Sequence, residues 1–147
     1  MKKTFRGRAI IPGEWTGTCV VSRQGMNTLA SFQKGALAGK KTIHCSDQNN
    51  PDLYGKALTG VAVCLPKTIG STTGGMVLQT VAARGVGPAA LLFSERIDSL
   101  AAGGVILAKV WNDTSVVTVD GLGDEFLRHV RDGMTVRIEP DGTVVAG

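Results

Sequence analysis

The sequence lacks any apolar run that approaches the roughly 20 residues needed for a membrane-spanning helix. Near the start, Arg8 and Pro12-Gly13 interrupt what would otherwise be the apolar region of a signal peptide. The three cysteines, Cys19, Cys45 and Cys64, are odd in number and show no C-x-x-C spacing. We therefore expect a cytoplasmic protein with reduced thiols and no membrane segment.

Aromatic residues are also scarce, at 5% of the chain. The 16 basic and 12 acidic residues give a net charge of +4, and they are dispersed along the sequence. A stripe of basic and aromatic residues, which would indicate nucleic-acid binding, is missing. The charge balance indicates only a modest preference for anionic ligands or an acidic partner.

A chain of 147 residues with 43% hydrophobic and 19% charged residues has the composition of a globular protein. It is long enough to bury an ordinary core and too short for two ordinary domains. No internal repeat, low-complexity segment or composition change marks a boundary. We expect one domain over residues 1–147.

The middle of the chain alternates between apolar runs and helical patterns. Continuous apolar strands between helices are typical of a parallel sheet buried on both faces. Glycines stand where helix ends are expected, at Gly85 and at Gly103-Gly104. The predicted elements are strand 61–65, helix 75–84, strand 89–93, a short helix around 95–101 and strand 105–110, which together make a βαβαβ unit.

The two ends of the chain are rich in β patterns. The predicted elements there are strands 9–11 and 18–21 around a hairpin or bend, strand 116–120, helix 124–131, and strands 134–139 and 143–145. Residues 23–56 read as a long connection, which in a compact domain is usually a functional or partner-docking surface. The expected fold class is α/β, with β-rich ends around the central unit.

The most distinctive segment is Lys67-Thr-Ile-Gly-Ser-Thr-Thr-Gly-Gly75, between a predicted strand and a predicted helix. A helix N-terminus offers unpaired N–H groups and the positive end of a dipole, so this junction predicts an anion site. Glycines there let a ligand approach the backbone closely. Ser71 is the most reactive side chain, although helix capping explains the hydroxyls locally about as well.

Three other site types fit poorly. Positions 69 and 73 are Ile and Thr, so Ser71 is not in a G-x-S-x-G elbow and a serine hydrolase is disfavoured. The segment 35–42 misses the spacing of a phosphate loop. His44-Cys45 has no other ligand at metal-binding spacing, which leaves open only a contribution to a site shared with another polypeptide.

The order of these features resembles a known family. Pro12-Gly13 with Gly17, the loop ending in Leu-Tyr-Gly55, Gly70-Ser71-Thr-Thr, Gly87-Pro-Ala-Ala and the run 101–108 occur in sequence. Together they are similar to the small, swivelling-domain subunit of aconitase X type dehydratases, over roughly residues 7–120. The resemblance implies a β/β/α swivelling fold.

The resemblance also implies a partner and a mechanism. Family members pair or fuse this domain with a large catalytic subunit, which carries an iron or iron-sulfur centre and most substrate contacts. The active site forms at the junction, and the family's catalytic base maps onto Ser71. Implied contacts to a small hydroxy-acid substrate are Gly70, Thr72, Thr73, Gly74 and, through a weaker match at 29–32, Ser31.

Known family activities are dehydration of cis-3-hydroxy-L-proline and of mevalonate 5-phosphate. The Ser71 segment contains no cation besides Lys67, and a phosphorylated substrate would need more positive charge. The sequence therefore favours cis-3-hydroxy-L-proline as the substrate. Many relatives have a serine-rich loop after the Gly-Ser pair, whereas this chain has Thr72-Thr-Gly-Gly75. This difference leaves the identity of the substrate undetermined. Two alternatives are a non-catalytic module that binds an anionic metabolite and a subunit that merely docks through residues 23–56.

Overall fold

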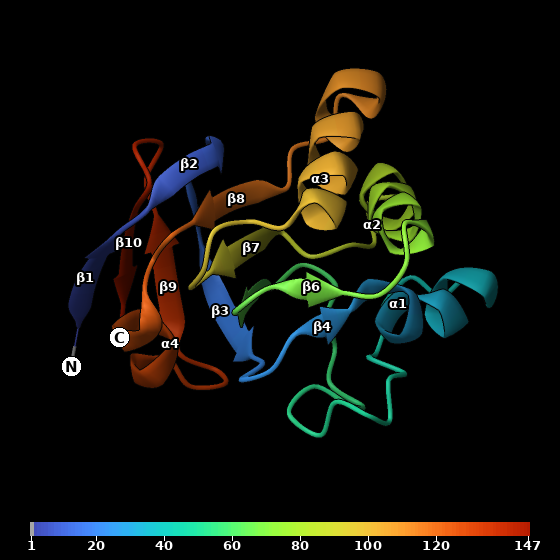
Figure 1. Ribbon diagram of the computed structural model, residues 1–147, viewed down its shortest axis with the longest axis horizontal. Helices are drawn as coiled ribbons and strands as arrows, with labels where there is room; N and C mark the ends of the chain where they lie inside the picture. The colour runs from blue at the N-terminus through green and yellow to red at the C-terminus, as the bar shows by residue number, and fades with distance from the viewer. Residues whose placement is uncertain (1) are drawn as a thin grey trace.

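The computed structural model describes residues 2–147, and its centre is an eight-stranded sheet in the order β1-β10-β9-β3-β5-β7-β8-β2. Gly7 alone separates β1 from β2, and these two strands form the two ends of the sheet. One continuous segment therefore closes the sheet into a barrel (Figure 1). The strands are β1 (Lys3–Arg6), β2 (Arg8–Ile11), β3 (Trp15–Val21), β5 (Ala62–Leu65), β7 (Ala90–Phe93), β8 (Val117–Asp120), β9 (Thr135–Ile138) and β10 (Thr143–Ala146).

Half of this barrel is parallel. β3, β5, β7 and β8 pair in parallel, and every residue of β5, β7 and β8 is buried. Successive side chains alternate between two cores: Cys64 and Leu92 face the barrel interior, whereas Val63 and Leu91 face the helices. Because both faces are covered, β5 and β7 are continuously apolar. The parallel pairing of β3, β5, β7 and β8 confirms the predicted parallel sheet.

Helices cover the outer face of the parallel half and one end of the barrel. α1 (Thr28–Leu37), α2 (Thr73–Ala83) and α3 (Ser99–Asn112) lie in a row, with α2 packed against both neighbours (Figure 1). The short α4 (Asp124–His129) packs on the barrel through Phe126, whose ring meets that of Phe5 edge-on at 5.2 Å. This mixed α/β arrangement agrees with the predicted fold class.

The predicted strand 105–110 is wrong, because these residues belong to α3. The expected short helix instead begins at Ser99, is capped by Asp98 and passes through the two glycines to Asn112. A Cβ atom at Gly104 would lie 2.9 Å from the carbonyl oxygen of Gly75 in α2. Gly104 therefore permits close contact between α2 and α3 rather than ending a helix. The βαβαβ unit is nevertheless present, with β8 as its third strand.

The first third of the chain also differs from the sequence prediction. The connection 23–56 contains α1, whose N-cap Asn27 accepts a hydrogen bond from the amide of Ala30 at 3.1 Å. Residues 12–14 link β2 to β3 without forming a hairpin, because β2 pairs with β8 while β3 pairs with β9 and β5. A short parallel pair, β4 (Met26–Asn27) with β6 (Thr68–Ile69), was not predicted.

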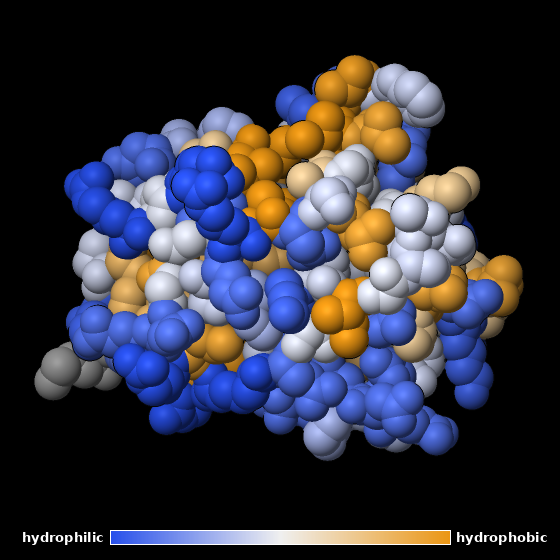
Figure 2. Space-filling view, viewed as in Figure 1, coloured by the Kyte–Doolittle hydropathy of each residue, from blue (hydrophilic) through white to orange (hydrophobic). Residues whose placement is uncertain are grey.

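Exposed apolar residues gather over α3. Ile106, Val110 and Trp111 of α3 are exposed, and apolar residues gather over this helix in Figure 2. None of the helices between residues 2 and 147 has the length and apolar character that crossing a membrane requires.

Candidate active site

The short strands β4 and β6 bring two helix N-termini together. They pair in parallel, with Met26 opposite Thr68 and Asn27 opposite Ile69. α1 follows β4 directly, and α2 follows β6 after the three-residue link 70–72, so the two helices start at the same edge (Figure 1). Neither helix has an acidic residue in its first turn. Two positive dipole ends therefore lie side by side, which favours an anion.

Ser71, Thr72 and Thr73 form the exposed tip of this junction. Among residues 2–147, none of their three amides donates a hydrogen bond to another residue. Thr72 is the N-cap of α2, and its side chain makes no capping hydrogen bond. The three hydroxyls are thus not used for capping, and the three amides remain available to a ligand.

Glycines in this segment have separate structural reasons. Gly70 has a φ of 113°, and a Cβ there would lie 3.2 Å from the side chain of Asn27. A Cβ at Gly74 would overlap the hydroxyl oxygen of Thr28 in α1. A Cβ at Gly75 would lie 2.9 Å from the carbonyl oxygen of Leu100 in α3. The first turn of α2 is therefore tightly held between α1 and α3.

Asp98, which the sequence analysis did not select, fixes the strand that leads into the Ser71 loop. Its Oδ1 accepts the amide of Thr68 at 2.8 Å, and its Oδ2 accepts the Thr68 hydroxyl. The same Oδ2 accepts the amide of Ala101 at 3.1 Å and so caps α3. An Asp before a helical run is a recognisable cap signal, but its link to Thr68, thirty residues away, appears only in the folded chain.

Ser31, expected to contact substrate, is not part of the exposed tip. It is fully buried in α1, one turn after Thr28, and the hydroxyls of both residues lack a hydrogen-bond partner in the described part of the chain. The structure thus brings Gly70, Ser71, Thr72, Thr73 and Gly74 together as one loop. It places Thr28, rather than Ser31, directly against that loop.

The described residues do not form a metal centre. Between residues 2 and 147, no group of three His, Cys, Asp or Glu side chains could hold a metal ion. Cys19, Cys45 and Cys64 are all buried. The pKa of the Cys64 thiol is raised by its hydrogen bond with Cys19 and by burial, which makes it a poor thiolate ligand. The chain therefore does not itself fit an iron centre.

Among the described residues, no side chain is placed to accept the proton of the Ser71 hydroxyl. In the described structure, no side chain accepts a hydrogen bond from the Ser71 hydroxyl. His129, one of the two histidines, contacts the carbonyl oxygen of Ala146 at 3.0 Å, and His44 lies on the long connection. The hydroxyl proton would therefore pass to solvent, to the substrate or to another chain.

A closed barrel flanked by helices, with an exposed hydroxyl loop at a helix N-terminus, defines a swivelling-domain class of α/β protein. A family model described as the aconitase X swivel domain matches residues 4–146. The chain belongs to this family.

Relatives and solved structures agree with this assignment. A phosphomevalonate dehydratase small subunit from Aeropyrum pernix is 30% identical over 95% of this chain and 90% of that protein. A cis-3-hydroxy-L-proline dehydratase from Hypocrea jecorina is 30% identical over 82% of this chain but only 19% of that protein. The crystal structure of Thermococcus kodakaraensis aconitase X in its holo form superposes with a TM-score of 0.81, at 24% identity and over 99% and 98% of the two chains, which shows the fold.

Proposed function

We propose that this chain is the small subunit of an aconitase X type dehydratase and that Ser71 is the catalytic base. The observation that carries the proposal is the exposed Ser71 beside three unpaired amides, where the N-termini of two helices meet. Relatives of matching length are named dehydratase small subunits, which supports a complex with a large subunit. Alone, the chain is expected to be inactive.

In this proposal the loop has two tasks. The amides of Ser71, Thr72 and Thr73, with the backbone at Gly70 and Gly74, hold the substrate carboxylate and the negative charge that develops on it. The Ser71 hydroxyl first gives its own proton to a group outside the described residues, and the positive end of the α2 dipole stabilises the resulting alkoxide. This alkoxide removes the proton next to the carboxylate, and the electrons of the broken C–H bond form the new double bond as the hydroxyl group departs. Ser31, which is fully buried in α1 one turn after Thr28, remains a predicted substrate contact.

The other half of the reaction belongs to the large subunit. Lewis-acid assistance to the departing hydroxyl is the chemistry that an iron centre supplies, and we assign its ligands to the partner.

Two hydroxy acids are candidate substrates, and different observations favour each. Mevalonate 5-phosphate is favoured by archaeal relatives that match nearly end to end. cis-3-Hydroxy-L-proline is favoured by the Hypocrea relative and by the uncharged tip of the loop, since Lys67 precedes β6 and no other Lys or Arg occurs between positions 67 and 75. A phosphate group would then need cations from the large subunit.

The test is dehydration by the chain co-expressed and co-purified with a large aconitase X subunit, assayed on both substrates. Ser71→Ala should lower kcat about 10²–10⁴-fold with little change in KM. Ser115→Ala, at an exposed serine in the loop before β8, is the matched control and should leave turnover unchanged. Near wild-type turnover in Ser71→Ala would show that the base lies elsewhere. Ligand binding by the isolated chain without dehydration in any complex would favour a binding module instead.

A further inference from the structure

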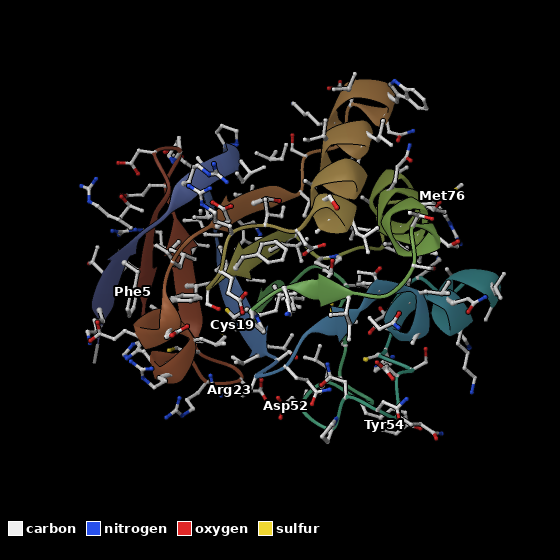
Figure 3. All side chains as sticks on the ribbon, in the orientation of Figure 1. Phe5, Cys19, Arg23, Asp52, Tyr54 and Met76 are labelled. Carbon is white, nitrogen blue, oxygen red and sulfur yellow. The ribbon has the colours of Figure 1, made fainter. Side chains whose placement is uncertain are left out.

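A cavity lies at the C-terminal end of α1, where the long connection folds back on that helix. Its volume is about 490 Å³, and its lining includes Lys34, Lys40, His44, Gln48 and Tyr54. None of its lining residues belongs to the Ser71 loop. Figure 3 shows Tyr54 on the connection that runs below α1.

The two ammonium groups of this cavity, those of Lys34 and Lys40, have no counter-ion among residues 2–147. No Asp or Glu lines the cavity, and Lys34, Lys40 and His44 form no ion pair with any carboxylate of residues 2–147. Lys3 and Lys56, by contrast, each pair with a carboxylate elsewhere on the surface. Like charges that share a concave surface repel one another, so an anion in the cavity would be stabilised.

The two ammonium groups are also not needed at the end of α1. The carbonyl oxygen of Lys34 accepts the amide of Ala38 at 3.1 Å, and that of Gly35 accepts the amide of Lys40 at 3.1 Å. The carbonyl oxygen of Ala36 accepts the guanidinium of Arg84 at 2.9 Å. These last-turn carbonyls are already satisfied, so capping does not explain the lysines.

We propose that this cavity binds a small organic anion with phosphate or carboxylate groups. Lys34 and Lys40 supply the positive charge, and the side-chain amide of Gln48 supplies neutral hydrogen-bond donors. Tyr54, which is 51% exposed, offers an aromatic surface to an apolar body. The volume falls within the range of about 300–1,000 Å³ that is usual for small-molecule sites.

Pyrophosphate is the probe, titrated into the full chain at low ionic strength by isothermal calorimetry and by amide NMR shifts. Lys34→Gln and Lys40→Gln should each weaken binding about 10-fold or more, the effect of losing one hydrogen bond to a charged group. Lys41→Gln is the matched control: it removes the same charge from the next residue, which is exposed and outside the lining. It should change affinity less than about twofold.

Three results would overturn the proposal. The first is the absence of saturable binding at millimolar pyrophosphate. The second is an equal loss of affinity in Lys40→Gln and Lys41→Gln, which would indicate diffuse surface charge. The third is that adding the large subunit abolishes pyrophosphate binding and also shifts the NMR signals of His44 and Tyr54. That result would show that the cavity is a contact surface for the large subunit.

Discussion

Replacing Gly74 with alanine tests the contact that holds the Ser71 loop against α1. The new Cβ would overlap the hydroxyl oxygen of Thr28, which is only 2% exposed. Thr28 is β-branched and buried, so it has little freedom to turn away. Overpacking of this kind costs about 1–3 kcal/mol, and the helix propensity of alanine returns at most about 1 kcal/mol.

The expected net loss is therefore about 1–2 kcal/mol in the free energy of unfolding. For a chain of this size, that loss corresponds to a fall in Tm of about 2–8 °C. A second substitution, Thr28→Ala, removes the offending oxygen. The nearest remaining atom of residue 28 would be its Cβ, at an ordinary contact distance of 3.8 Å from the new methyl group.

Thr28→Ala alone should be close to neutral, because it loses about 0.8 kcal/mol of methyl burial and also removes a buried hydroxyl that has no partner. The double variant should then recover most of the loss seen in Gly74→Ala. Urea unfolding of the wild type, both single variants and the double variant measures the coupling, which we expect to be about 1 kcal/mol or more. Additive effects, or a fully stable Gly74→Ala, would refute the contact.

Two further stability predictions follow from particular contacts. Gly104→Ala should destabilise by about 1–3 kcal/mol because its Cβ would lie 2.9 Å from the Gly75 carbonyl oxygen, whereas Gly103→Ala, with nothing within 4 Å, should stabilise by up to about 1 kcal/mol; equal effects in thermal melts would contradict the close contact of α2 with α3. Burial would raise the pKa of Asp120, but its hydrogen bonds with Arg8 and with the Ile97 amide outweigh burial and hold the pKa below its usual value. Its contribution to stability is therefore complete above the unfolded pKa of about 3.9 and is lost as the pH falls toward the folded pKa. Asp120→Asn should flatten the decline of the urea midpoint in this range, and an unchanged decline would be the contrary result.

The strands of the parallel sheet were predictable because burial on both faces leaves a continuous apolar run. Strand 89–93 was predicted almost to its ends, and strand 61–65 differs by one residue. The same rule failed at 105–110, which is equally apolar but belongs to α3. An apolar run of six residues fits either a strand or part of a buried helix. The length of the whole element distinguishes the two, but only when its ends are known. Gly103-Gly104 was taken as such an end, whereas Gly104 serves the contact with α2.

The candidate site was predictable in part. A run of glycines and hydroxyls between a strand and a helix indicated the Ser71 loop, because its chemistry is local. Asp98 and Thr28 were missed, because their roles depend on contacts with Thr68 and Gly74 that are distant in sequence. The pairing of β4 with β6 places α1 beside the loop. It could not be predicted, because two residues are too few to show a strand pattern.

The sequence by itself determined the buried strands of the sheet, the position of Ser71 before a helix, and the resemblance to the aconitase X swivelling domain. These depend on local order: apolar runs, turn residues and short motifs. Only the tertiary structure decided that β1 and β2 close the barrel and that two helix N-termini meet at the loop. It also decided that Lys34 and Lys40 share a cavity. Such features depend on contacts between segments that are distant in the sequence, and these contacts form only when the chain folds.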